Sequence, residues 1–100
     1  MFPKWYSPPY SFDWKETLHK VAAIYRVSPD DIMGRSRKRH ITDARWVFIK
    51  ATRAKGRLSY PRIGEILGRD HTTIMHACQN FRDRADYRGE MHQALQRVLG

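Results

Sequence analysis

Apolar residues recur at steps of three and four along most of this chain, the repeat of an α-helix with one face against a core. One such stripe comprises Trp14, Leu18, Val21 and Tyr25, and another comprises Ile74, Ala77, Cys78 and Phe81. No stretch shows the period of two that is typical of a half-buried strand. The pattern therefore predicts an all-α fold, and 100 residues leave room for one hydrophobic core.

Residues that favour helix ends divide this pattern into about six helices. Short polar side chains accept hydrogen bonds from the first turn of a helix, so the expected N-caps are Asp13, Ser28, Thr42, Ser59 and Asp70. Asp13 and Glu16 have the spacing of a capping box. Glycine is common just after a helix, so the expected ends are Gly34, Gly56 and Gly68. The last two helices are expected at His71–Arg84 and Glu90–Leu99.

Two segments lack this pattern. The basic run Arg35–His40 has no apolar period, and we expect an exposed loop there. Residues 1–12 alternate aromatic residues with Pro3, Pro8 and Pro9, which prevent a helix, so we expect an extended arm attached to one domain of residues 13–100. The aromatic residues of the arm either pack onto that domain or bind a partner protein.

Positive charge is concentrated in the middle of the chain. The whole sequence has 19 Lys and Arg against 10 Asp and Glu, and residues 35–57 contain nine of those cations and one acid, Asp43. Such a density favours a polyanionic partner, although a solvated surface has the same composition. A membrane surface is disfavoured because no Trp/Leu-rich amphipathic face lies behind the basic run. No apolar stretch is long enough to span a bilayer or to act as a signal peptide.

Two short expected helices, Ser59–Leu67 and His71–Arg84, are separated by Gly68, Arg69 and Asp70, which is the pattern of a helix-turn-helix. The outward face of the second helix carries neutral residues: Thr72, Thr73, Met75, His76, Gln79 and Asn80. An ordinary solvated face would carry Glu and Lys. Neutral donors, acceptors and a thioether instead suit base edges and thymine methyl groups in a major groove.

The string from Gly68 to Cys78, GRDHTTIMHAC, closely resembles the signature of the C-terminal DNA-binding domain of the bacterial replication initiator DnaA. The preceding LSYPRIGE, residues 58–65, is similar to the start of that family's helix-turn-helix. The resemblance covers about residues 14–82. It implies a Trp-repressor-like all-α fold and a recognition helix that enters the major groove of a short DnaA-box-like site in double-stranded DNA.

The resemblance also implies which residues contact DNA. Arg37 matches the arginine that enters the minor groove, Arg45 matches a further DNA-contacting arginine, and Arg53 and Pro61 match backbone contacts. The full candidate set is Arg37, Lys38, Arg39, Arg45, Arg53, Pro61, Arg69, Asp70, His71, Thr72, Thr73, Met75 and His76.

Three positions depart from the family pattern. Trp46 stands where a polar, DNA-facing residue is common, Met75 replaces leucine, and the turn has one glycine where many members have two. The chain also lacks the Gly-x-x-x-x-Gly-Lys-Ser/Thr string of an ATPase. We therefore expect a small regulator of transcription or replication that reads DNA without nucleotide hydrolysis.

Two other functions are less favoured by the sequence. A non-specific architectural DNA-binding protein would use the same basic segment. An enzyme is disfavoured, because His71 and His76 diverge on a helix and Cys78 belongs to an apolar stripe. We expect no cofactor and no metal. A single cysteine excludes an internal disulfide and favours the reducing cytoplasm, and DNA binding would associate the protein with the nucleoid.

Overall fold

The computed structural model describes residues 12–87 and 89–100, and of Tyr87 the backbone alone. Six helices and no strands occur in these ranges. The helices are α1 (Trp14–Tyr25), α2 (Pro29–Met33), α3 (Arg39–Gly56), α4 (Tyr60–Leu67), α5 (His71–Tyr87) and α6 (Glu90–Leu99). The predicted all-α fold is confirmed. The predicted arm lies outside the described residues, except for Phe12.

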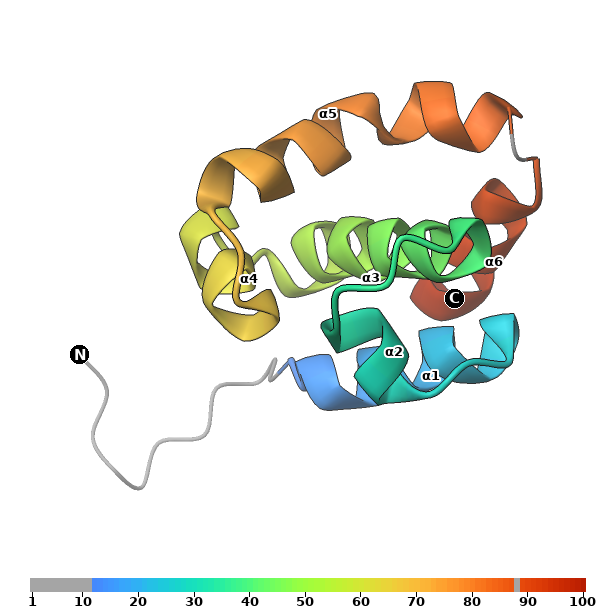
Figure 1. Ribbon diagram of the computed structural model, residues 1–100, viewed down its shortest axis with the longest axis horizontal. Coiled ribbons are helices and arrows are strands. Elements are labelled where there is room, and N and C mark those ends of the chain that lie inside the picture. Colours follow the sequence, from blue (N-terminus) through green and yellow to red (C-terminus); the bar gives the residue numbers. More distant parts are fainter. Residues whose placement is uncertain (1–11, 88) are drawn as a thin grey trace.

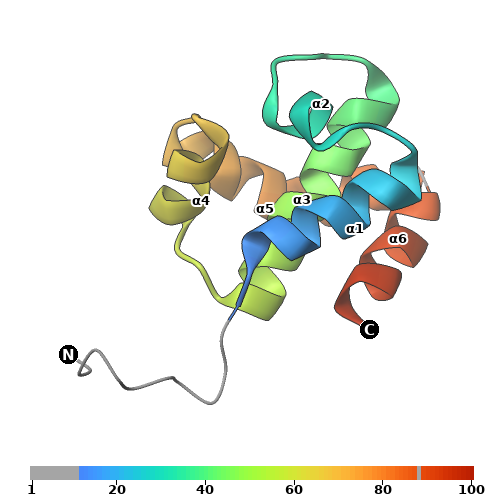
Figure 2. The same cartoon turned by 90° about the horizontal axis from the view of Figure 1, so that it is seen from below.

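Helix α3 forms the centre of the fold and packs against each of the other five described helices. Figures 1 and 2 show α5 on one side of α3 and α1 with α2 on the opposite side. Helix α6 packs against α3, α1 and α5, and α4 packs mainly against α5. The helix-turn-helix is therefore attached to the body mainly through α3, with a smaller contact between α5 and α6.

The core lies along the buried face of α3, where Ala44, Val47, Phe48 and Ala51 are fully excluded from solvent. The predicted stripes on α1 and α5 meet this face: Leu18 and Val21 are buried on α1, and Ile74, Ala77, Cys78 and Phe81 are buried on α5. Trp14 and Tyr25 at the two ends of α1 are partly buried against the same cluster. The helical spacing thus predicted the core correctly.

Capping interactions explain where the short helices begin. Ser28 and Asp31 form a reciprocal capping box, in which each side chain accepts a hydrogen bond from the other residue's backbone N–H at 3.1–3.2 Å. Ser59 caps α4 by accepting from the N–H of Arg62 at 3.2 Å. Asp13 caps α1 by accepting from the N–H of Lys15 at 3.0 Å. Glu16 forms an ion pair with Lys20 at 3.4 Å.

The predicted start of α3 at Thr42 is wrong by one turn. The helix begins at Arg39, and the N–H of Thr42 donates to the carbonyl of Lys38 at 2.9 Å. The side chain of Ile41, which is 5% exposed, extends the buried stripe toward the N-terminus and stabilises this extra turn. Arg39 and His40 therefore lie on a helix, and the exposed segment between α2 and α3 is shorter than expected.

Helix α3 ends at Gly56 as predicted, but its cap differs, and α5 is longer than predicted. Gly56 is the last residue of α3, and Arg57 rather than Gly56 adopts the left-handed conformation, with a φ of 54°. Gly56 serves a close approach, because a Cβ there would lie 2.5 Å from Cδ2 of Phe12. Helix α5 continues past Arg84 to Tyr87, since Ala85 is fully buried and adds one more core contact.

Candidate nucleic-acid interface

The turn between α4 and α5 is built by close backbone packing. Gly68 has a left-handed φ of 65°, and the N–H of Arg69 donates to the carbonyl of Gly64 at 2.8 Å. A Cβ on Gly64 would lie 2.5 Å from the carbonyl oxygen of Arg69. The turn therefore requires glycine at position 64 for space and at position 68 for conformation. Sequence reasoning found the role of Gly68 and missed that of Gly64.

Asp70 begins α5 as predicted. Its Oδ1 accepts hydrogen bonds from the backbone N–H of Thr72 at 3.0 Å and from the Thr72 hydroxyl at 3.1 Å. These bonds, together with His71 whose Nδ1 lies 3.2 Å from the same oxygen, hold the pKa of Asp70 below its ordinary value. The cap therefore carries a negative charge at neutral pH, at the positive end of the α5 dipole.

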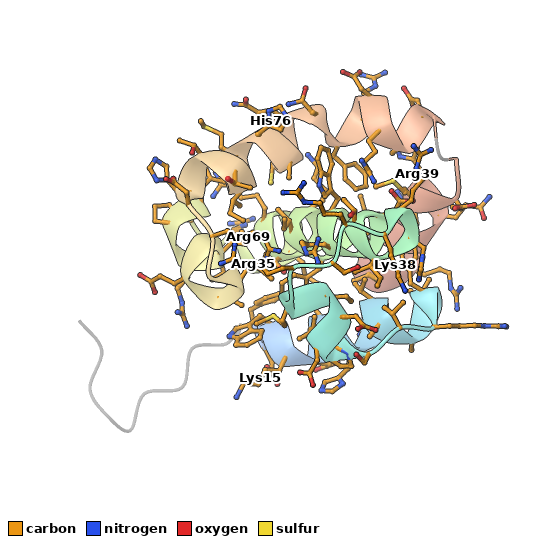
Figure 3. The ribbon with its side chains drawn as sticks, viewed as in Figure 1. Lys15, Arg35, Lys38, Arg39, Arg69 and His76 are labelled. Atoms are coloured by element: carbon orange, nitrogen blue, oxygen red, sulfur yellow. The ribbon has the colours of Figure 1, made fainter. Side chains whose placement is uncertain are left out.

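The outward face of α5 presents the neutral side chains that the spacing predicted. His71, Thr72, Thr73, His76 and Gln79 are exposed, and Met75 and Asn80 are partly buried. Figure 3 shows His76 on α5. Cys78 faces inward, and burial raises the pKa of its thiol, so it remains protonated in the core at neutral pH.

His76 is held by contacts from its own helix and from α3. The amide nitrogen of Asn80 donates to the His76 carbonyl at 2.8 Å and lies 3.1 Å from His76 Nδ1. The ring of Trp46 meets the His76 ring edge to face, with centres 6.3 Å apart. Trp46 thus packs between α3 and α5.

Arg84 connects Trp46 to a buried acid. Its guanidinium lies 5.1 Å from the centre of the Trp46 ring and binds Oδ1 of Asp43 through two nitrogens, at 2.7 and 2.8 Å. Asp43 is fully buried. Sequence reasoning missed this cluster, because Asp43 and Arg84 are 41 residues apart and read separately as surface charges.

The side chain of Arg45 is buried and does not face solvent. It is 7% exposed, and its guanidinium donates to four backbone carbonyls, of Asp31, Ile32, Gly34 and Ser36, at 2.7–3.1 Å. Burial lowers the pKa of Arg45, and the neighbouring Arg69 lowers it further. In this geometry its donors hold the end of α2 and the segment that follows, instead of projecting toward a ligand.

Arg69 reaches the same segment from the helix-turn-helix. Its two terminal nitrogens donate to the carbonyls of Leu67 at 3.1 Å and of Gly34 at 2.6 Å. Burial lowers the pKa of Arg69, and the charge of Arg35 lowers it further. Figure 3 shows Arg69 and Arg35 close together.

A pocket of about 340 Å³ lies between the basic segment, residues 35–39, and α5. Its lining contains four arginines and no acidic residue: Arg35, Ser36, Arg37, Thr42, Arg45, Trp46, Ile49, Arg69, Thr73 and Ala77. Because Thr73 belongs to the outward face of α5, the pocket joins that face to the cationic segment. Cations with no acidic residue beside them, next to neutral hydrogen-bond donors, favour an anionic ligand.

The remaining candidate residues surround these two surfaces. Arg37, Lys38 and Arg39 are exposed, and Figure 3 shows Lys38 and Arg39 on the side of the molecule that faces the viewer. Arg53 donates to the carbonyl of Leu58 at 2.9 Å and lies over the ring of Tyr60, and Pro61 is exposed at the start of α4. Arg53 therefore presents an ordered guanidinium.

Within residues 12–87 and 89–100, no three His, Cys, Asp or Glu side chains are placed to hold a metal ion. In the same part of the chain, no helix combines the length and the apolar character needed to cross a membrane.

Comparison with known proteins supports the sequence motif. The family model described as "Bacterial dnaA protein helix-turn-helix" matches residues 15–80. The chromosomal replication initiator protein DnaA of Bifidobacterium animalis subsp. lactis is 37% identical over 78 residues, which are 77% of this chain and 13% of that protein. The protein of the same name from Rippkaea orientalis is 39% identical over 79 residues, 78% of this chain and 17% of the relative. The chain thus spans less than a fifth of the length of these relatives.

Proposed function

This chain belongs to the bacterial DnaA helix-turn-helix family, and we propose that it binds a specific sequence in double-stranded DNA, with α5 in the major groove and the basic segment 35–39 in the adjacent minor groove. One observation carries the proposal. The pocket that contains Arg35 and Arg37 also contains Thr73, so the cationic segment and the neutral face of α5 adjoin each other. A ligand that contacts both must be anionic and also carry hydrogen-bonding edges, as DNA does.

The two surfaces would contribute differently to binding. Arginines and lysines of the basic segment neutralise phosphates, which supplies affinity that falls steeply with salt. The hydroxyl groups, imidazoles and thioether on α5 contact base edges and thymine methyl groups, and each good contact is worth about 1–3 kcal/mol of discrimination. The first turn of α5 adds backbone N–H groups near a phosphate.

We assign the proposed DNA contacts to side chains that are exposed or partly exposed in the structure. Base contacts are assigned to His71, Thr72, Thr73, Met75 and His76, and to the second carboxylate oxygen of Asp70. Arg37 enters the minor groove, and Lys38, Arg39, Arg53 and Pro61 contact the DNA backbone. Arg45 and Arg69 support the segment that carries Arg37, since their donors are already bound to carbonyls.

The biological role that we propose is occupancy of a DnaA-box-like site by a cytoplasmic, nucleoid-associated regulator of transcription or replication. These 100 residues contain no Gly-x-x-x-x-Gly-Lys-Ser/Thr string, so the proposal includes no nucleotide-driven step. Occupying a site can block a competitor or recruit a partner. A partner surface on residues 1–12, of which only Phe12 belongs to the described part of the chain, remains a prediction.

A non-specific architectural role is the second candidate, because the exposed cations at positions 35–39 would bind any duplex. Selection of bound duplexes from a random pool, at two salt concentrations, separates the two functions. Sequence-specific binding predicts a common motif that persists at the higher salt. Equal affinity for selected and scrambled duplexes would show that the protein does not read sequence.

A further inference from the structure

The carbonyl oxygen of Gly34 accepts hydrogen bonds from two arginines of different helical units. Arg45 of α3 donates to it at 3.0 Å, and Arg69 of the helix-turn-helix donates at 2.6 Å. We call these two side chains, with the carbonyls of Asp31, Ile32, Gly34, Ser36 and Leu67 that they bind, the arginine clamp. The clamp is built from two side chains and five backbone oxygens.

Arg69 has a particular place in this clamp. Its Nη1 binds Leu67, the last residue of α4, and its Nη2 binds Gly34, the residue after α2. Helix α2 packs against α1 and α3, whereas α4 packs against α5 and α3. Arg69 therefore bridges two parts of the fold that are 35 residues apart in sequence and meet beside the basic segment.

Electrostatic repulsion opposes the close approach of these arginines. Arg35, Arg45 and Arg69 all line one pocket that has no acidic residue in its lining. Like charges in a partly buried site repel each other more strongly than in water. The clamped carbonyls offset this repulsion for Arg45 and Arg69.

We propose that Arg69 is a positioning residue, which through the Gly34 carbonyl holds segment 35–38 at a fixed place relative to α5 before any ligand binds. On DNA, this rigidity lets the minor-groove and major-groove elements bind as one unit, a consequence that rests on the proposed function. The clamp itself does not depend on that function. Its test therefore includes a measurement without DNA.

The first measurement is the NMR order parameter of the backbone amides at positions 35–38 in the free protein. The substitution Arg69→Lys keeps the positive charge but replaces two donor nitrogens in a fixed fork by one, so it cannot bind Leu67 and Gly34 as arginine does. Wild type is expected near the rigid value of about 0.85, and Arg69→Lys below about 0.6. Arg97→Lys, an exposed change on α6, is the matched control and is expected to match wild type.

Unchanged order parameters in Arg69→Lys would overturn the proposal, whatever the protein binds. If that variant is too unstable to measure, Arg69→Gln, which also has one donor nitrogen in place of two, replaces it and is expected to lower the order parameters in the same way. Circular dichroism must show α-helical content equal to wild type, so that local loosening is distinguished from unfolding.

The second measurement uses a duplex selected with the wild-type protein, if such a duplex is obtained. Arg69→Lys is expected to lose about tenfold in affinity with an unchanged salt slope, because the cost is ordering the segment and not a missing charge. Wild-type affinity would instead identify Arg69 as a simple point charge on phosphate and refute its positioning role. A wild type without sequence preference refutes the proposed function, while the order parameters still decide the clamp.

Discussion

Replacing Arg45 with methionine is expected to destabilise the protein without removing a DNA contact. Methionine retains most of the apolar stem in a side chain that is 7% exposed, so packing changes little. The change removes the Arg45 donors to four carbonyls at the end of α2 and in the segment that follows, of which that of Gly34 keeps its bond from Arg69. The perturbation is therefore mainly a loss of hydrogen bonds.

The four carbonyls are not equivalent. Ile32 accepts the one buried bond, at 2.7 Å, and loses this donor. The bonds to the other three carbonyls are partly buried, so Asp31 and Ser36 can bind water instead, and Gly34 keeps its bond from Arg69. A hydrogen bond to a charged group contributes about 1.5–3 kcal/mol, and each rehydrated carbonyl loses less than that. We expect the free energy of unfolding to fall by about 3 kcal/mol, a large part of the roughly 5–15 kcal/mol of a small domain.

Urea denaturation followed by circular dichroism measures this loss. With a slope of about 1.5 kcal/mol per molar urea, the midpoint falls by about 2 M at constant slope. Arg45→Lys restores one donor nitrogen and is expected to recover a minor part of the lost free energy of unfolding. Affinity for a selected duplex, measured where all variants are folded, is the second readout.

The reasoning is refuted if Arg45→Met unfolds at the wild-type urea concentration. It is also refuted if the variant keeps wild-type stability but loses affinity with a salt slope lower by about one, since that result is expected of a direct phosphate contact.

Four further predictions concern the helix-turn-helix and its surroundings. Gly64→Ala places a Cβ 2.5 Å from a backbone oxygen, so thermal unfolding should show a loss of about 2–3 kcal/mol, while Gly89→Ala, which meets nothing within 4 Å, should change little. Arg84→Met leaves the buried carboxylate of Asp43 without this partner, and a loss of about 3 kcal/mol is expected, the lower end for buried pairs because Arg84 is partly exposed. Because folding lowers the pKa of Asp70, its charged form stabilises the start of α5 at neutral pH, and this contribution disappears as the pH falls below about 4. Amide exchange at Thr72 should report that loss in wild type and not in Asp70→Asn. Thr73→Ala should lower affinity mainly for duplexes with particular bases of the selected site, whereas Arg37→Ala should weaken binding to all duplexes and reduce the salt slope by about one. An equal loss of affinity on every sequence from Thr73→Ala would contradict direct readout.

Local patterns predicted most of the fold because the interactions that make a helix are local. The stripe on α5 and the caps at Ser28, Ser59 and Asp70 depend on residues within one or two turns, and all are present. The start of α3 was wrong because Ile41 gains its stability from the core, which a window of sequence does not contain.

The site was less predictable for a related reason. The exposed polar face of α5 follows from helical periodicity. The partners of Arg45 and Arg69 are backbone carbonyls up to 35 residues away. Because every residue has a backbone carbonyl, the sequence does not indicate which of them accept these hydrogen bonds. Both arginines were candidate DNA contacts, Arg45 by resemblance to the family, and the structure shows which carbonyls they bind.

The arginine clamp has a consequence for redesign of the protein. Because its two side chains bind main-chain oxygens at Asp31, Ile32, Gly34 and Ser36, the acceptors in these hydrogen bonds are present whatever side chains the segment carries. Exchange of Arg35, Arg37 and Lys38 is therefore expected to alter the proposed minor-groove preference with the clamp in place, whereas one residue inserted or deleted between Gly34 and Ser36 would shift a clamped oxygen. The clamp therefore constrains the length of the segment more strongly than its side chains.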